Sequence, residues 1–415
     1  MEMNHPNAGA NPFEGMVVES GNDFRVDTRV YLDQAVFDEE MRRIYESTWV
    51  YVGHASEIPN PGDYKTATVG LNPVIVSRSA DGQVNVLLNE CRHRANAVCR
   101  ESYGNARNLQ CHYHGWVYSL SGDIVGITHP QGYALDFAQK LGGLLRLRHA
   151  VYRGLIFASM TDAVPSIEDH LGDVRKYVDL WADLSPEPEF RVARPHLYGY
   201  QGNWKFQAEN GHDGWHARFV HESAFQTAAD FGGPPASARS TVGYTRGFDG
   251  GYALLERHGI SQGLSAEQLE AYRAALGRNR TPEELELRWH VRHVYLFPNV
   301  FLFDNLIRVI QPVDVGKTNI FSHPLLLNGV SPDINRVRML EVQARLGTTG
   351  MVSLDDLEMF AGNQTGMRGR KMRWVVLSHG MGQEEKVAGS ELRGEDHSEL
   401  PQRALYRQWA RMMAK

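Results

Sequence analysis

Apolar and polar positions alternate in two different rhythms along this chain. Apolar residues recur at three- and four-residue spacing between positions 33 and 49 (Val36, Phe37, Met41, Ile44 and Tyr45), which predicts a helix. Residues 1 to about 24 carry no such pattern and are predicted to form a loose arm. From position 51 to about 156, short β-branched runs alternate with turn signals. Ala80-Asp81-Gly82, for example, separates two such runs and predicts a hairpin. This stretch therefore predicts a small all-β domain.

The second part of the chain mixes both rhythms. Helical spacing returns over 166–181, and two prolines near 186–188 mark a joint. Two capping boxes, Ser265-x-x-Gln268 and Thr281-x-x-Glu284, predict helix starts. Strands are predicted over 289–297, 300–303, 306–310 and 318–321, and helices over 333–346 and 401–413. The predicted fold class is α+β. An arm and helix (1–46) would pack on the last domain. A β domain (47–160) would follow, and an antiparallel sheet with helices (161–415) would complete the chain.

Composition places the chain among ordinary globular proteins. It has 415 residues, of which 42% are hydrophobic and 22% charged. The net charge of −6 makes nucleic acid an improbable partner. No run of about 18 apolar residues predicts a membrane span, and the N-terminus has no secretory pattern. With only three cysteines, a disulfide framework is excluded, and the expected compartment is the reducing cytoplasm.

Two of the three cysteines fall in one pattern with histidines. Cys91-x-His93 is followed by Cys111-x-x-His114, and both pairs are predicted to lie in loops between strands. Two loops that each offer one thiolate and one imidazole can share a metal centre. Cys₂His₂ suits a structural zinc ion, whereas two cysteines on one iron and two histidines on another form a Rieske [2Fe–2S] cluster. The pattern alone leaves both possibilities open, beside that of unrelated polar residues.

A second cluster of metal-binding side chains lies downstream. The segment Asp213-x-x-His216-x4-His221 places Asp213 and His216 three residues apart, which is one face of a helix. His221 shares that face if the helix bulges or ends between the two histidines. Two imidazoles and a carboxylate form the facial triad of non-haem Fe(II) oxygenases. Taken alone, two histidines in one helix are weak support for a metal site.

Together the two clusters resemble the large (alpha) subunit of bacterial Rieske non-haem iron, aromatic-ring-hydroxylating oxygenases. The resemblance rests on the loops 91–94 and 111–116 and on Asn203-Trp204-Lys205, Glu209-Asn210 and the histidine segment, with Trp215 where tyrosine is usual. It implies that Cys91, His93, Cys111 and His114 hold the [2Fe–2S] cluster. It also implies that His216, His221 and Asp356 hold mononuclear Fe(II). Asp355 is the alternative third ligand, and Ser353 would cap the helix that carries it.

The resemblance implies further roles and partners. Asp213 would bridge His114 of one subunit to His216 of the next, so a ring of subunits, α₃ or α₃β₃ with a small β subunit, is expected. Electrons would come from NAD(P)H through a separate reductase or ferredoxin, consistent with the lack of a dinucleotide-binding glycine motif here.

Segments 210–221, 355–358 and 406–409 resemble those of oxygenases that act on benzoate-type acids, namely benzoate, anthranilate, salicylate and halobenzoate. The expected reaction is therefore mono- or cis-dihydroxylation of an aromatic carboxylate with O₂, with Arg308 or, less favoured, Arg218 binding the acid. The alternatives are an electron-transfer Rieske protein, an oxygenase of a non-carboxylate substrate, and a zinc-stabilised binding module.

Overall fold

The computed structural model describes residues 11–188, 190–230, 243–258, 263–369 and 371–415. The chain forms two compact units. One, called here the β unit, comprises residues 45–170 and 189–193. The other, called the sheet unit, comprises residues 1–44, 171–188 and 194–415. Within the described residues, no helix is long and apolar enough to cross a membrane.

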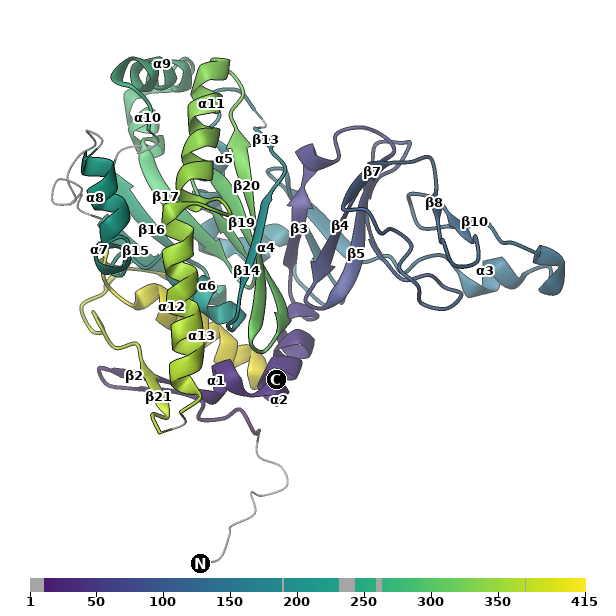
Figure 1. Ribbon diagram of the computed structural model, residues 1–415, viewed down its shortest axis with the longest axis horizontal. Coiled ribbons are helices and arrows are strands. Elements are labelled where there is room, and N and C mark those ends of the chain that lie inside the picture. The colour runs from purple at the N-terminus through teal and green to yellow at the C-terminus, as the bar shows by residue number, and fades with distance from the viewer. Residues whose placement is uncertain (1–10, 189, 231–242, 259–262, 370) are drawn as a thin grey trace, which may run out of the picture. The chain divides into compact units, whose positions relative to one another are not determined.

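The β unit is built from small antiparallel sheets, as the short β-branched runs predicted. The sheets run β6-β5-β4-β7, β10-β9-β8 and β11-β12-β3 (Figure 1). The predicted hairpin joins β5 and β6 in the register Val76↔Val86, and Gly82 supplies the positive φ of +83° in its turn. The strands are β3 (Val50–His54), β4 (Asp63–Val69), β5 (Asn72–Arg78), β6 (Val84–Leu88), β7 (Tyr103–Asn105), β8 (Leu109–Gln110), β9 (Val117–Tyr118), β10 (Ile124–Gly126), β11 (Arg148–Tyr152) and β12 (Leu155–Ser159). Two short helices, α3 (Phe137–Leu141) and α4 (Ile167–Leu171), complete the unit.

One large antiparallel sheet dominates the sheet unit, in the order β14-β20-β19-β18-β17-β16-β15-β23-β22. The strands are β14 (His196–Tyr200), β15 (Gly243–Gly247), β16 (Ala253–His258), β17 (His290–Leu296), β18 (Val300–Leu302), β19 (Leu306–Asp314), β20 (Lys317–Leu326), β22 (Glu385–Ala388) and β23 (Glu391–Glu395). All four predicted strand runs lie in this sheet. The α+β architecture is therefore confirmed.

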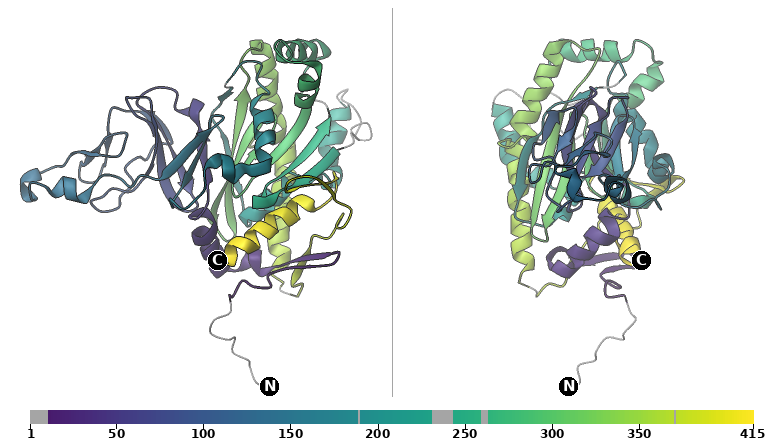
Figure 2. Two further views of the ribbon diagram at one scale, coloured as in Figure 1. Left: turned by 180° about the vertical axis from the view of Figure 1, so that it is seen from behind. Right: turned by 90° about the vertical axis from the view of Figure 1, so that its right-hand side faces the viewer.

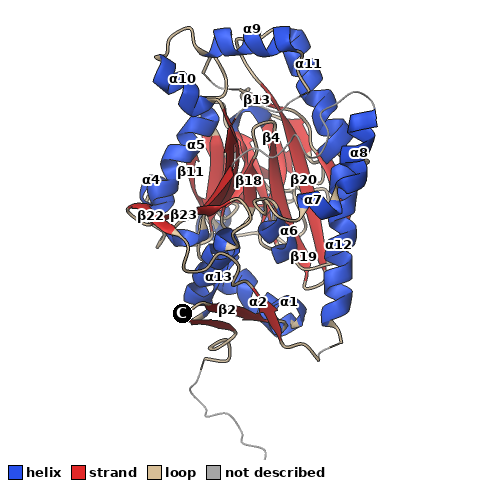
Figure 3. Ribbon diagram, turned by 90° about the vertical axis from the view of Figure 1, so that its left-hand side faces the viewer, coloured by secondary structure: helices blue, strands red, loops and turns tan. Residues whose placement is uncertain are grey.

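Helices cover both faces of this sheet. Figure 3 shows α5 on one side and α8, α11 and α12 on the other. The bounds are α5 (Arg175–Ala182), α6 (Trp204–Asn210), α7 (Ala217–Val220), α8 (Glu222–Asp230), α9 (Ala266–Leu276), α10 (Pro282–Arg288), α11 (Pro332–Glu341), α12 (Met351–Met367) and α13 (Leu400–Met413). Both capping boxes are confirmed, since Ser265 and Thr281 each cap a helix reciprocally with the residue three positions on.

The N-terminal segment differs from the predicted loose arm. Residues Val17–Ser20 (β1) and Asp23–Asp27 (β2) form a hairpin, and β2 also pairs with β21 (Trp374–Val376). The pairing partner lies about 350 residues downstream, which local sequence patterns do not reveal. Two short helices, α1 (Arg29–Leu32) and α2 (Gln34–Glu40), follow, and Figure 2 shows them beside the yellow α13.

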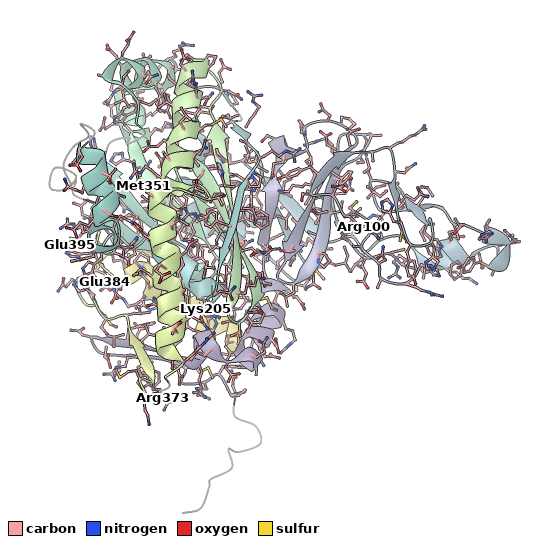
Figure 4. All side chains as sticks on the ribbon, viewed as in Figure 1. Arg100, Lys205, Met351, Arg373, Glu384 and Glu395 are labelled. Atoms are coloured by element: carbon pink, nitrogen blue, oxygen red, sulfur yellow. The ribbon has the colours of Figure 1, made fainter. Side chains whose placement is uncertain are left out.

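A fully buried ion pair fastens these terminal helices to α6. Lys205, labelled in Figure 4, donates to Glu40 over 2.6 Å, and both side chains are completely buried. The indole N–H groups of Trp204 and Trp409 donate to the same carboxylate. Glu40 therefore satisfies donors from α6 and α13 at once, which fixes the N-terminal end of α6 between two distant parts of the chain.

Candidate metal centres

The two cysteine-histidine loops of the β unit share one backbone design. Each cysteine N–H donates to the carbonyl five residues on, and each cysteine carbonyl accepts from the N–H four residues on. The fourth residue has positive φ in both loops: Ala95 at +54° and Gly115 at +71°. The sequence thus builds two matching knuckles, and their rims carry Cys91 with His93 and Cys111 with His114.

The side chains of these knuckles have complementary exposure. Cys91 and Cys111 are buried, whereas His93 and His114 are partly exposed, with ring centroids 4.4 Å apart. A buried sulfur pair beneath a surface histidine pair is the donor set of a Rieske cluster, in which cysteines hold one iron and histidines the other. The residues therefore fit a [2Fe–2S] group. Cys99 stands apart as a free, buried thiol whose pKa burial raises to about 12.

Tyr118 adds a hydrogen bond to one sulfur of this set. Its hydroxyl lies 3.1 Å from Cys91 Sγ and accepts the backbone N–H of Arg92 over 3.1 Å. Because the oxygen already accepts from that N–H, its own proton is free to point at the sulfur. Asn96 Nδ2 lies 3.7 Å from Cys111 Sγ in the other half.

In the sheet unit, His216, His221 and Asp356 come together from two segments. Asp356 Oδ1 lies 3.5 Å from His216 Nε2 and 3.3 Å from His221 Nε2. One ligand atom from each residue lies within 4.8 Å of the others, a spacing that suits one metal ion. The cluster is mostly enclosed, since His221 and Asp356 are buried. The two histidines and one carboxylate therefore fit a mononuclear iron that keeps open positions.

Each of the two imidazoles has a further carboxylate on its other side, next to Nδ1. Asp355 Oδ2 lies 3.3 Å from His221 Nδ1, and Asp213 Oδ2 lies 3.5 Å from His216 Nδ1. A carboxylate at Nδ1 favours the proton there and leaves Nε2 free to bind a metal. Asp355 and Asp356 thus stand on different sides of His221. The geometry favours Asp356 as the metal-facing acid.

Neighbouring charges shift the pKa values of two of these groups. Burial alone would lower the pKa of His221, but Asp356 and Asp355 outweigh it and raise the pKa. Burial would likewise raise the pKa of Asp213, but the His216 ring and the backbone N–H groups of Trp215 and His216 lower it. Asp213 is therefore held as an anion beside His216.

Two local details differ from the sequence prediction. Asp213 precedes the helix rather than lying on it, because the segment turns at Gly214, where a Cβ would lie 2.1 Å from the Asp396 carbonyl oxygen. Ser353 is not the cap of the acid-bearing helix, since α12 begins after Gly350 and buries Ser353 inside. The break expected between the histidines is present: α7 starts after His216 and ends at His221.

Asn210 belongs to this site although its role was not predicted. Its side-chain amide donates to Asp356 Oδ1 and contacts His216 Nε2, each over 3.2 Å. It is the last residue of α6. Only its place directly after Glu209 in the family pattern pointed to it in the sequence.

The predicted substrate-binding arginines lie in different surroundings. Arg308, on β19, is 3% exposed, and its guanidinium lies over the ring of Phe303 at 5.1 Å. Phe303 packs against His293, whose Nδ1 contacts the Gly211 carbonyl over 3.0 Å. These contacts connect Arg308 to the loop that carries His216. Arg218, by contrast, is exposed on α7.

Comparison with known proteins covers nearly the whole chain. The Rieske [2Fe–2S] domain family matches residues 48–139, and the ring-hydroxylating alpha subunit (catalytic domain) family matches residues 184–415. The anthranilate 1,2-dioxygenase large subunit of Acinetobacter baylyi is 32% identical over 86% of this chain and 80% of its own length. The toluate 1,2-dioxygenase subunit alpha of Pseudomonas putida is 31% identical over 88% and 84%.

A solved structure shares the fold. Naphthalene 1,2-dioxygenase with indole bound superposes with a TM-score of 0.84 at 23% identity, covering 95% of this chain and 93% of that one.

Proposed function

Because this chain belongs to the family of Rieske ring-hydroxylating oxygenase large subunits, we propose that it hydroxylates the ring of an aromatic carboxylic acid. Members of this family are oxidoreductases that contain a Rieske [2Fe–2S] cluster and a mononuclear non-haem iron. When bound, the cluster supplies single electrons and the iron supplies the binding site for O₂. The choice of an aromatic acid is supported by relatives named for anthranilate, 2-halobenzoate and toluate.

The residues are proposed to act as follows. Cys91, Cys111, His93 and His114 hold the cluster, and His216, His221 and Asp356 hold the iron. Asp355 holds the Nδ1 proton of His221, and Asp213 lies beside Nδ1 of His216 as a nearby anion. Asn210 holds Asp356 and His216 in place from the end of α6.

The observation that carries the substrate class is the unpaired edge of Arg308. Its Nε and Nη2 are buried and have no hydrogen-bond partner among the described residues. These two nitrogens form one edge of the guanidinium, which is the edge that binds a carboxylate through two parallel hydrogen bonds. A buried cation with two free parallel donors fits the carboxylate of an aromatic acid. The exposed Arg218 is the weaker candidate.

The proposal includes partners. Relatives named as large or alpha subunits support an assembly with further chains, either α₃ or α₃β₃. Electrons would arrive from NAD(P)H through a separate reductase, with or without a ferredoxin. Asp213, anionic and next to His216, would connect that histidine to His114 of a neighbouring subunit.

A single turnover under ¹⁸O₂ tests the function without the electron partners. The purified protein, chemically reduced, is mixed with benzoate, 2-aminobenzoate, 2-hydroxybenzoate or a 2-halobenzoate, and the products are analysed by mass spectrometry. We expect one or two labelled oxygens on the ring of at least one acid. If no acid is labelled while both metal centres are intact, the carboxylate assignment is wrong. If His216→Ala still gives product, the assignment of the iron ligands is wrong. If the wild-type protein transfers electrons but forms no product, the electron-transfer alternative is supported.

Replacing Arg308 tests its role directly. Hydrogen bonds to a charged group contribute about 1.5–3 kcal/mol, so Arg308→Gln should weaken binding of the acid about 10- to 150-fold. Arg218→Gln is the matched control, with an expected change of less than about threefold because exposed charges contribute little. Equal effects of the two variants would remove Arg308 from the site.

A further inference from the structure

His212 is a buried side chain whose polar atoms have no partner. It is 0% exposed, and neither Nδ1 nor Nε2 makes a hydrogen bond to any described residue. The other buried histidines in the described ranges, His54, His221 and His323, have no such unpaired nitrogen. Leaving buried polar atoms unpaired is costly, so such atoms in a native fold call for a ligand or another partner.

The imidazole of His212 is neutral in this position. Burial lowers its pKa to about 3, more strongly than Asp213 raises it. A neutral imidazole has one N–H donor and one bare nitrogen that accepts. His212 therefore offers both kinds of hydrogen bond at the same time.

Those rings connect His212 with Arg308. The His212 ring packs against Phe301 at 5.4 Å and Tyr295 at 5.6 Å. Phe301 is the cross-strand partner of Arg308 in the β18-β19 register, so the two side chains stand on the same face of the sheet. Phe301 thus neighbours both residues, His212 by ring contact and Arg308 as its cross-strand partner, and both carry buried hydrogen-bonding atoms without a partner among the described residues.

We propose that His212 and Arg308 form a two-point recognition site, in which Arg308 binds the carboxylate and His212 binds a hydroxyl or amino substituent on the same aromatic ring. This rests on the proposed function. A hydroxyl can donate to one nitrogen or accept from the other, and an aromatic amine can donate. A hydrogen, methyl or halogen substituent leaves both nitrogens of His212 unpaired. The favoured substrates are therefore hydroxy- or amino-substituted aromatic acids.

The size of the preference follows from the unpaired atoms. A site built to hydrogen-bond a hydroxyl or amine rejects the analogue that lacks it, because its own polar groups then stay unpaired. One such hydrogen bond corresponds to about a tenfold or larger difference in kcat/KM. Of the two rings that pack on His212, Phe301 has no polar atom, and the hydroxyl proton of Tyr295 is already donated to the Pro298 carbonyl.

Paired substrates test the site. The kcat/KM values are measured with chemically reduced protein, or with the reconstituted electron chain, for 2-, 3- and 4-hydroxybenzoate and 2-aminobenzoate against benzoate and 2-methylbenzoate. We expect at least a tenfold preference for one hydroxy or amino acid. His212→Phe should reduce that preference to below threefold, because it slows the favoured acid more than it slows benzoate. His212→Asn, which keeps a donor and an acceptor, should retain most of it, and His149→Phe in the β unit is the matched control.

The outcomes separate this inference from the proposed function. If the wild-type protein hydroxylates none of the acids, the proposed function fails. If it hydroxylates benzoate or 2-methylbenzoate as well as the substituted acids, the function stands and the His212 site is refuted. An unchanged preference in His212→Phe refutes it as well. Should His212→Phe fail to fold, judged by the Rieske spectrum and iron content, the wild-type preference and the His212→Asn variant decide.

Discussion

Replacing Glu209 by glutamine should change how the stability of this protein depends on pH. The Glu209 carboxyl group lies within hydrogen-bond distance of the hydroxyls of Tyr31, at 2.8 Å, and Tyr406. The two hydroxyls are themselves 2.6 Å apart. Three oxygen-oxygen contacts need three protons, but the tyrosines supply two. The third comes from the carboxyl group, so the geometry itself favours a neutral Glu209.

Burial of Glu209 favours the same neutral form. Burial is the largest cause and raises its pKa to about 7, although the two tyrosines and Lys205 act to lower it. Starting from the ordinary 4.5, the shift corresponds to roughly 3 kcal/mol, at 1.36 kcal/mol for each pH unit. Because the folded state holds the proton more tightly than the unfolded state, this contribution is fully present below pH 4.5. It declines as the pH rises and is lost above about pH 7.

The assay is denaturant unfolding of the wild type and Glu209→Gln between pH 5 and 8. Glutamine cannot titrate, so the variant should lack the wild-type decline across this range. The difference in unfolding free energy between the two proteins should shift by up to about 3 kcal/mol in favour of the variant as the pH rises. Glu283→Gln, at an exposed position on α10, is the control and should follow the wild type. Parallel curves for wild type and Glu209→Gln would refute the neutral carboxyl.

Three further predictions concern single side chains. Tyr118→Phe removes the hydrogen bond to Cys91 Sγ. Because this bond stabilises the more negative reduced form of the cluster, the reduction potential should fall by roughly 50–100 mV in a spectroelectrochemical titration. An unchanged potential would contradict the hydrogen bond. Lys205→Met leaves the buried Glu40 carboxylate without its counter-ion and should lower the unfolding free energy by about 3–5 kcal/mol. Adding Glu40→Gln to this variant should recover part of the loss. An equal loss in the single and the double variant would argue against the ion pair. Asp355→Asn removes the carboxylate that fixes the His221 tautomer. It should weaken iron binding about 10- to 100-fold in a competition with a chelator, while the Rieske EPR signal stays unchanged. Iron binding as tight as in the wild type would show that Asp355 has a purely structural role.

Local patterns predicted the parts of the fold that depend on neighbours in sequence. The capping boxes at Ser265 and Thr281 satisfy their own backbone donors, so the sequence contains all that they need. The hairpin turn at Gly82 is equally local. The strands of the large sheet were also found, because each is a short apolar run bounded by turns.

Features that depend on distant partners were not found. The N-terminal hairpin is a stable element because β2 pairs with β21, which the first 24 residues do not encode. Ser353 looked like a helix cap because its side chain suits that role, but Gly350 precedes it and the helix starts earlier. His212 and Asn210 have ordinary sequence surroundings, and their importance appears only when the sheet and Asp356 lie next to them.

Through α6, the ends of the chain support the residues proposed to bind iron. At the start of this helix, Lys205 is held by Glu40 from α2; at its end, Glu209 is held by Tyr31 from α1 and Tyr406 from α13. The next residue, Asn210, contacts both His216 and Asp356. A movement at either end of α6 would therefore shift the Asn210 amide, and with it the contacts of this amide to His216 and Asp356. This explains why residues 29–40 and 400–413, remote from the histidines in sequence, are built into the same unit as the site.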